Sequence, residues 1–173
     1  MAASDIQTER LRLTPMTVAA IDALIAGDRA ALEAEVGAAF PEPLAPPPET
    51  GDVLGFFREL AAEETPWAPR LIVLREPPTV LGSGGAMAPD VDGRCVVGYG
   101  IYPEHEGNGY ATEALVGMIA ALTDHVDVST VVATIHPHND ASRRVAEKAG
   151  MRVTGQTIDP KEGLLDVWEI SAR

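Results

Sequence analysis

Residues 98–115 read Gly-Tyr-Gly-Ile-Tyr-Pro-Glu-His-Glu-Gly-Asn-Gly-Tyr-Ala-Thr-Glu-Ala-Leu, and they give the clearest indication of the fold. A strand pattern ends at Tyr102, a polar loop with two glycines follows, and apolar residues then recur at helical spacing. The stretch therefore predicts a strand, a loop and an amphipathic helix in direct succession. The apolar face of this helix consists of Ala111, Ala114, Leu115, Met118, Ile119 and Leu122.

Downstream of this unit, residues 128–135 form a β-branched run that predicts another strand. A strand, helix and strand in this order make the two strands parallel neighbours. A short helix is expected from Ala141 to Ala149, with Asn139 or Asp140 as its N-cap and Gly150 after its end. The chain then closes with a predicted β-hairpin over residues 151–158 and 164–170.

Upstream of the unit, the pattern predicts a strand at residues 10–13 and two short helices, the second capped by Asp28. Five prolines make residues 41–50 a loop, and a helix is expected to open at Asp52. Strands at 71–74, 79–81 and 95–102 indicate an antiparallel meander. We therefore expect one domain spanning residues 1–173, of the α+β class, with a mixed sheet.

The amino-acid composition limits the classes of molecule that the protein is expected to bind. The chain has 13 Lys and Arg against 26 Asp and Glu, a net charge of -13, which disfavours nucleic acid and anionic membrane surfaces and favours a cationic acceptor. No apolar run approaches the roughly 20 residues of a membrane helix. The single cysteine, Cys95, excludes an internal disulfide framework, and the start of the chain lacks a signal-peptide pattern. A cytoplasmic protein is expected, with Cys95 in its core.

The loop from Glu106 to Ala111 is the candidate ligand site. A helix start offers backbone amides without intrahelical partners, and Gly107 and Gly109 would let an anion approach them closely. The alternative is that both glycines only shape a tight loop. A dinucleotide fingerprint would need glycine at Thr112, and no Gly-Lys-Ser/Thr phosphate loop occurs in the chain.

Several jointly spaced motifs resemble the GNAT acetyltransferases. They are Gly98 to Pro103, Gly107 to Ala114, and Asn139, Ser142, Arg143, Glu147-Lys148 and Gly150-Met151. The opening residues 8–13, Thr-Glu-Arg-Leu-Arg-Leu, are similar to the ribosomal-protein alanine N-acetyltransferase branch of that superfamily. The resemblance implies a mixed, mostly antiparallel sheet flanked by helices, with a central parallel strand pair splayed around the cofactor.

That cofactor would be acetyl-CoA, used as a cosubstrate without a metal. The resemblance implies that its pantetheine arm lies between the two central strands like an added strand, and that its pyrophosphate rests on the glycine loop. The expected cofactor-binding residues are Ile101, Tyr102, Pro103, Gly107, Asn108, Gly109, Tyr110, Ala111, Thr112, Asn139, Ser142 and Arg143.

Catalytic roles follow from the same resemblance. Ser142 would be the acid that protonates the leaving thiolate, or else a plain helix-face serine, and the Ile101 N–H would be the oxyanion donor. His136 is the candidate base, with a water relayed from a loop carboxylate as the alternative. A metal site at His136 and His138 is disfavoured because Pro137 separates them and no further ligands follow.

Two positions depart from the family pattern. Glu106 stands where relatives carry Arg or Gln and is expected to point to solvent, and Val96 stands where many relatives carry a glutamate base. The predicted function is acetyl-CoA-dependent N-acetyl transfer to an amine by direct attack in a ternary complex. The alternative is a catalytically weakened acyl-CoA-binding sensor or partner domain. The acceptor stays open between a protein N-terminus, a polyamine, an aminoglycoside and a small amine, and a homodimer is among the assemblies left open.

Overall fold

A computed structural model describes residues 4–48, 50–63 and 65–172 of the protein. Its eight strands form one sheet in the order β1-β2-β3-β4-β5-β6-β8-β7, in which every neighbouring pair except β5 and β6 is antiparallel. The expected mixed, mostly antiparallel sheet is therefore confirmed. The strands are β1 (Ile6–Gln7), β2 (Leu11–Pro15), β3 (Arg70–Arg75), β4 (Pro78–Ala86), β5 (Arg94–Ile101), β6 (Thr130–Ile135), β7 (Arg152–Asp159) and β8 (Gly163–Ser171).

The helices begin and end largely where capping residues indicate. The Asp28 side chain accepts a hydrogen bond from the Ala31 N–H, and that of Asn139 accepts one from the Ser142 N–H, so both predicted caps are confirmed. The helices are α1 (Val18–Ala26), α2 (Arg29–Val36), α3 (Leu54–Ala62), α4 (Tyr110–Thr123) and α5 (Asp140–Lys148), with short 3-10 turns η1 (Gly51–Val53) and η2 (Pro103–His105). None of the described helices has the length and apolar character needed to cross a membrane.

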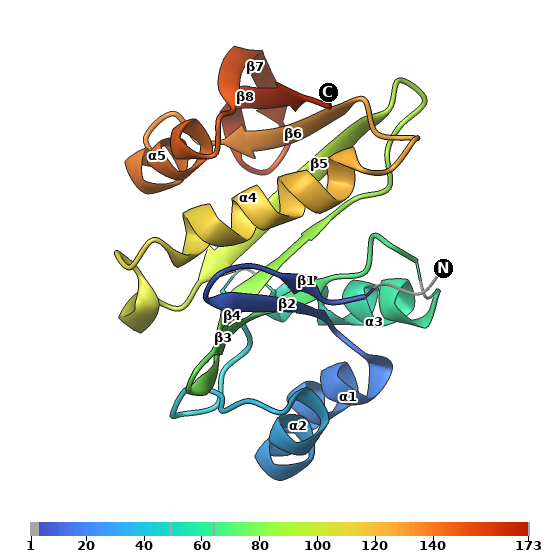
Figure 1. The fold of residues 1–173 in the computed structure, drawn as a ribbon, viewed down its shortest axis with the longest axis vertical. Coiled ribbons are helices and arrows are strands. Elements are labelled where there is room, and N and C mark those ends of the chain that lie inside the picture. The colour runs from blue at the N-terminus through green and yellow to red at the C-terminus, as the bar shows by residue number, and fades with distance from the viewer. Residues whose placement is uncertain (1–3, 49, 64, 173) are drawn as a thin grey trace.

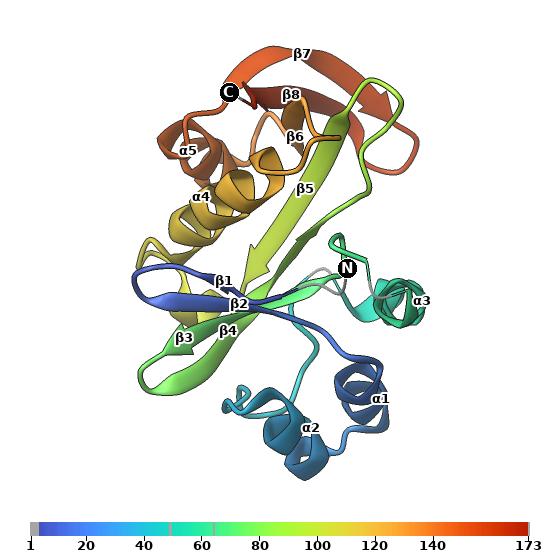
Figure 2. The same cartoon turned by 45° about the vertical axis from the view of Figure 1, so that its right-hand side comes forward.

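The helices cover the two faces of the sheet separately. Helix α4 lies across one face, while α1, α2 and α3 lie on the opposite side of the N-terminal strands (Figures 1 and 2). Successive side chains of β3 point to opposite faces of the sheet. Ile72 packs in the core under α4, and its neighbours Leu71 and Val73 pack in the core under α1 to α3. The sheet is therefore buried on both faces at its centre.

The parallel pair β5 and β6 separates along its length. Only residues 94–96 of β5 are in register with residues 130–132 of β6, although β5 continues to Ile101. The Val96 carbonyl accepts from Met87 N–H and the Tyr102 N–H donates to Leu81 O, so the main-chain groups of even-numbered residues in β5 point to β4. The N–H and C=O of Ile101 therefore point to the β6 side, where the strands have parted.

Two predicted elements that line the site described below differ in extent by two residues or more. Strand β4 runs from Pro78 to Ala86 rather than over 79–81, because Gly82, Gly84 and Gly85 lack the β-branched side chains that signal a strand in sequence. The helix expected to open at Asp52 begins at Leu54, after the 3-10 turn η1. Both shifts bear on the site, since β4 and α3 line it.

Candidate active site

The loop before α4 has the geometry of an anion site. Gly107 and Gly109 adopt φ of 77° and 80°, the left-handed region that favours glycine. Gly109 caps α4 without a side chain, and in the described parts of the chain no hydrogen bond takes its donor from the backbone amides of residues 107–112. These amides and the positive end of a 14-residue helix favour a negatively charged ligand.

Arg10 braces this loop from a distant part of the chain. Its Nε donates to Glu113 Oε2 at 2.7 Å and its Nη1 donates to the Asn108 carbonyl at 3.1 Å. The guanidinium also lies over the Tyr110 ring, 4.7 Å from the ring centroid. The loop between β1 and β2 thus holds both the glycine loop and the first turn of α4, which explains why the opening motif accompanies the glycine motif.

Glu113 is the anchor of that brace. Its Oε1 accepts from the Thr8 hydroxyl at 2.6 Å and from the Arg10 N–H at 2.7 Å. Partial burial raises the pKa of Glu113, but the hydrogen bonds from Thr8 and Arg10 and the Arg10 charge outweigh it and leave the pKa below its usual value of 4.5. Glu113 is therefore an ionised anchor and not a proton donor near neutral pH.

A cavity of about 380 Å³ extends from the glycine loop to α5 and brings most of the predicted cofactor residues together. The splayed end of β5 supplies one wall, the start of α4 the second and α5 the third. The predicted residues that line it are Ile101, Gly107, Gly109, Tyr110, Ala111, Thr112, Asn139 and Ser142.

Four predicted cofactor residues have side chains that do not line this cavity. Tyr102 is buried in the core under α1 to α3 and its hydroxyl donates to Ala45 O at 2.7 Å, and burial raises its pKa. Pro103 opens the exposed turn η2. The side-chain amide of Asn108 donates to the backbone carbonyls of His105 and Glu106, so this side chain shapes the loop. Arg143 turns back to Pro137 O at 3.1 Å and towards Asp166 at 3.8 Å.

Two cations in the cavity wall were missed by the sequence interpretation. Arg144 and Lys148 line the cavity, one helical turn apart on α5, together with Ala141 and Val145. These four positions follow the i, i+3, i+4, i+7 spacing of one helix face. From this spacing, the sequence could have indicated Arg144 instead of Arg143 as the residue that faces the cavity. Glu106 is exposed, as predicted. It also borders the cavity.

Ser142 lies where β5 and α5 are tied together. Its side chain is half-buried on the cavity wall, and its backbone carbonyl accepts from the Tyr99 hydroxyl at 3.4 Å. The Asn139 cap uses the Ser142 N–H, which leaves the hydroxyl out of the cap. The Ile101 N–H, predicted to be the oxyanion donor, points into the same gap.

His136 and Cys95 do not join this cluster. His136 is exposed beyond the end of β6, its Nδ1 accepts from the His138 N–H at 3.4 Å, and it lines neither this cavity nor the one described below. Cys95 is fully buried, and burial raises the pKa of its thiol to about 11, as a core position predicts. Within the described residues, no three His, Cys, Asp or Glu side chains gather as a metal site requires.

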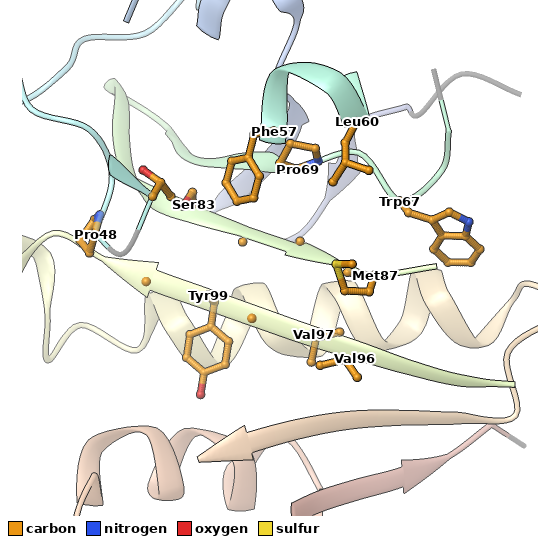
Figure 3. Close-up of a pocket in the computed structure, with 16 residues that line it drawn as sticks. Pro48, Phe57, Leu60, Trp67, Pro69, Ser83, Met87, Val96, Val97 and Tyr99 are labelled. Atoms are coloured by element: carbon orange, nitrogen blue, oxygen red, sulfur yellow. The ribbon is translucent and has the colours of Figure 1, made fainter. Parts of the chain in front are cut away.

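A second cavity of about 280 Å³ opens on the face of β4 and β5 opposite α4 (Figure 3). Phe57 and Leu60 of α3 lie above it, and Val96, 41% exposed, lies at its floor. Val96 thus faces this cavity, in the position where the resemblance would place a base. Both cavities share Pro48, Tyr99 and Gly100, so they meet at one point on β5.

Comparisons with known proteins identify solved structures that share this fold. Solved structures with this fold include RimJ from Mycobacterium smegmatis in complex with CoA-disulfide, at 20% identity and a TM-score of 0.66, which covers 94% of this chain and 82% of that one. An acetyltransferase from Agrobacterium tumefaciens has 24% identity, a TM-score of 0.66 and coverage of 98% and 95%. The aminoglycoside acetyltransferase AAC(6')-Ib in complex with coenzyme A has 17% identity, a TM-score of 0.67 and coverage of 93% and 94%.

The comparison with curated proteins finds no match. The family described as the acetyltransferase (GNAT) domain matches residues 10–152, which is more than half of the chain. That range contains the brace residue Arg10, the glycine loop, and all three walls of the cofactor-side cavity. The chain therefore belongs to the GNAT acetyltransferase family.

Proposed function

We propose that this protein transfers the acetyl group of acetyl-CoA to an amine by direct attack in a ternary complex. The observation that carries the proposal is the meeting of two cavities at Tyr99 and Gly100. One cavity has the amides and cations that suit an anionic cofactor. The other reaches the same segment of β5 from the opposite side, so an acceptor in it could attack a thioester held in the first.

The cofactor-side cavity would hold acetyl-CoA in three ways. The pyrophosphate would accept from the free amides at residues 107–112, and Arg144 and Lys148 would offset phosphate charge on a protein whose net charge is -13. A pantetheine amide would donate to the Ile101 carbonyl, as an added strand does, which leaves the Ile101 N–H for the thioester oxygen. Such pairing would bring the thioester next to Tyr99 and Ser142.

The reaction balances without a metal or a redox partner. The acceptor ammonium loses one proton to solvent, and its nitrogen then bonds to the acetyl carbonyl carbon. The carbon–sulfur bond breaks, the nitrogen loses a second proton, and the thiolate gains one from the Ser142 hydroxyl, which solvent reprotonates. The Ile101 N–H stabilises the oxyanion of the tetrahedral intermediate. The products are an N-acetyl amine and CoA thiol.

No candidate base lines the acceptor side in the described parts of the chain. Val96 faces the cavity where a carboxylate would act, and His136 is exposed outside both cavities. We therefore assign the rate mainly to positioning of the two substrates and to Ser142, with water as the proton acceptor. The same observation favours the second candidate function, an acyl-CoA-binding sensor with weak or no transferase activity.

One pair of measurements decides between the two functions. Calorimetry with acetyl-CoA and with CoA tests binding, and a thiol-release assay over a panel of amines tests transfer, with mass spectrometry of the acetylated product. Binding together with amine-dependent thiol release supports the transferase. Binding without release for any amine supports the sensor, and absence of binding overturns both.

A further inference from the structure

We infer that the acceptor is a primary monoamine carried on an apolar, uncharged body, and that this body occupies the cavity between α3 and strands β4 and β5. The inference rests on the proposed function and names the substrate class of that site. It is carried by the chemistry of the cavity wall, by a floor built from glycines, and by the junction with the cofactor side.

The wall of this cavity is apolar. Among the described residues none of the side chains that line it is charged, although the protein as a whole has 26 acidic residues. Its aromatic and aliphatic surface comes from Phe57, Leu60, Trp67, Met87 and Val96 (Figure 3). A second cation on the acceptor would lose its hydration there without an opposite charge to replace it.

The floor of the cavity is made of backbone. Gly85 of β4 pairs with Gly98 of β5, and paired residues of antiparallel strands point to the same face. A Cβ on Gly98 would meet no atom within 4 Å, and one on Gly85 would meet only Pro69 at 3.4 Å, on the cavity side of the sheet. Two facing glycines thus leave a slot against the sheet into which a flat or aliphatic group fits.

The slot leads to the reaction centre. Gly100 lies two residues beyond Gly98 on the same face, and a Cβ there would lie 3.1 Å from the Pro48 carbonyl. Pro48, Gly100 and Tyr99 border both cavities, so the amine of a ligand whose body fills the slot would emerge at the thioester side. The cavity volume of about 280 Å³ suits a ring or a branched alkyl group rather than a large polycation.

The first test compares an apolar monoamine with a diamine. We expect 2-phenylethylamine to be acetylated with a kcat/KM at least about tenfold above that of 1,4-diaminobutane, because one apolar group in such a pocket typically changes kcat/KM by this factor or more. A short peptide that begins with leucine tests whether the amine is a protein N-terminus. Equal or higher kcat/KM for the diamine would overturn the inference.

The second test fills the slot. Gly98→Leu should lower kcat/KM for 2-phenylethylamine at least about tenfold, mainly through KM. Its Kd for acetyl-CoA, measured by calorimetry, should stay within about twofold. Gly155→Leu is the matched control, because Gly155 is also an exposed strand glycine whose added Cβ meets nothing within 4 Å. A Gly98→Leu protein that binds acetyl-CoA and keeps its activity on the monoamine would overturn the inference.

A third variant tests a change of substrate specificity instead of a loss of activity. Met87 is 49% exposed on the cavity wall, so Met87→Glu places a carboxylate there without burying it fully. The ratio of kcat/KM for diamine over monoamine should rise at least about fivefold, since the new charge replaces hydration of the second ammonium. An unchanged ratio would contradict the slot. If the wild type acetylates no amine while acetyl-CoA binds, the proposed function has failed, which is a different result.

Discussion

The two sides of the candidate active site are built in different ways. The cofactor side uses main chain from residues 107–112 and from the end of β5, and side chains from one helix face of α5. The acceptor side uses Pro48 and residues from α3, from the segment just before β3, and from β4 and β5, which meet only in the folded sheet. A binding site made of backbone groups from one segment depends little on the side chains around it. A cavity wall made of side chains from separate segments changes with each substitution. Family membership therefore predicts the cofactor more sharply than the acceptor.

The junction between the two sides gives the largest expected effect. Ser142→Ala should lower kcat by about two to three powers of ten, the typical cost of losing one donor to a developing charge. Acetyl-CoA affinity should change little, because the backbone N–H and not the hydroxyl of Ser142 takes part in the α5 cap. Single-turnover kinetics with calorimetry measure both. An unchanged kcat would show that Ser142 is only a helix-face serine.

Damage to the glycine loop should act on the cofactor alone. Gly109→Val places a β-branched side chain at φ 80°, so the loop must shift and the amide cluster is lost. We expect acetyl-CoA binding to weaken about a hundredfold, since hydrogen bonds to charged groups contribute about 1.5–3 kcal/mol each. Gly37→Val is the control, with the same strain at φ 67° after α2. Similar Kd values for both variants would place the anion site elsewhere.

Adding the missing carboxylate probes the acceptor side. Val96→Glu should raise kcat/KM about tenfold or move the pH-rate profile to lower pH, because a positioned base removes the ammonium proton more readily than water does. The 41% exposure of Val96 allows the charge to stay hydrated. A pH-rate profile of wild type and variant measures this. A wild type already fast at neutral pH, and a variant identical to it, would mean that another group takes the proton.

The cations of α5 should contribute a smaller share. Arg144→Ala and Lys148→Ala should each weaken acetyl-CoA binding about threefold, because exposed charge pairs contribute about 0.2–1 kcal/mol. The loss should shrink at high salt. Lys161→Ala, at the exposed turn between β7 and β8, is the matched control. Calorimetry at low and high salt measures the change in affinity. An equal loss of affinity in the control would indicate that the net charge of the protein, and not the position of the two cations, affects binding.

The Arg10 brace should depend on pH with a definite sign. The pKa of Glu113 is lowered on folding, so its ionised form stabilises the fold above the usual value of 4.5 and loses that effect as pH falls through the folded pKa. Glu113→Gln should lower the Tm about 2 to 4 °C at pH 7, from a loss of about 1 kcal/mol. The difference from wild type should narrow below about pH 4.5. A constant difference down to pH 3 would contradict an ionic anchor.

Prediction from the sequence succeeded where a signal is local. The glycine loop, the α5 cap at Asn139 and the helix face of α4 follow from neighbouring residues, and all three are observed. Local patterns say less about a side chain's position where that position depends on helix rotation or on distant partners. Arg143 and Arg144 are neighbours in sequence but point to different places, because each residue turns the helix by about 100°.

The sequence by itself therefore determined the family, the order of elements and the backbone of the anion site, because glycine dihedrals, caps and hydrophobic periodicity act over a few residues. The folded structure was needed to show that Arg10 braces that loop, that Gly85 is paired with Gly98 in the slot, and that Val96 lies in an apolar cavity wall. Those arrangements join segments up to a hundred residues apart, and strand register and helix packing place them. The pairing of distant strands is what sets which side chains share a cavity.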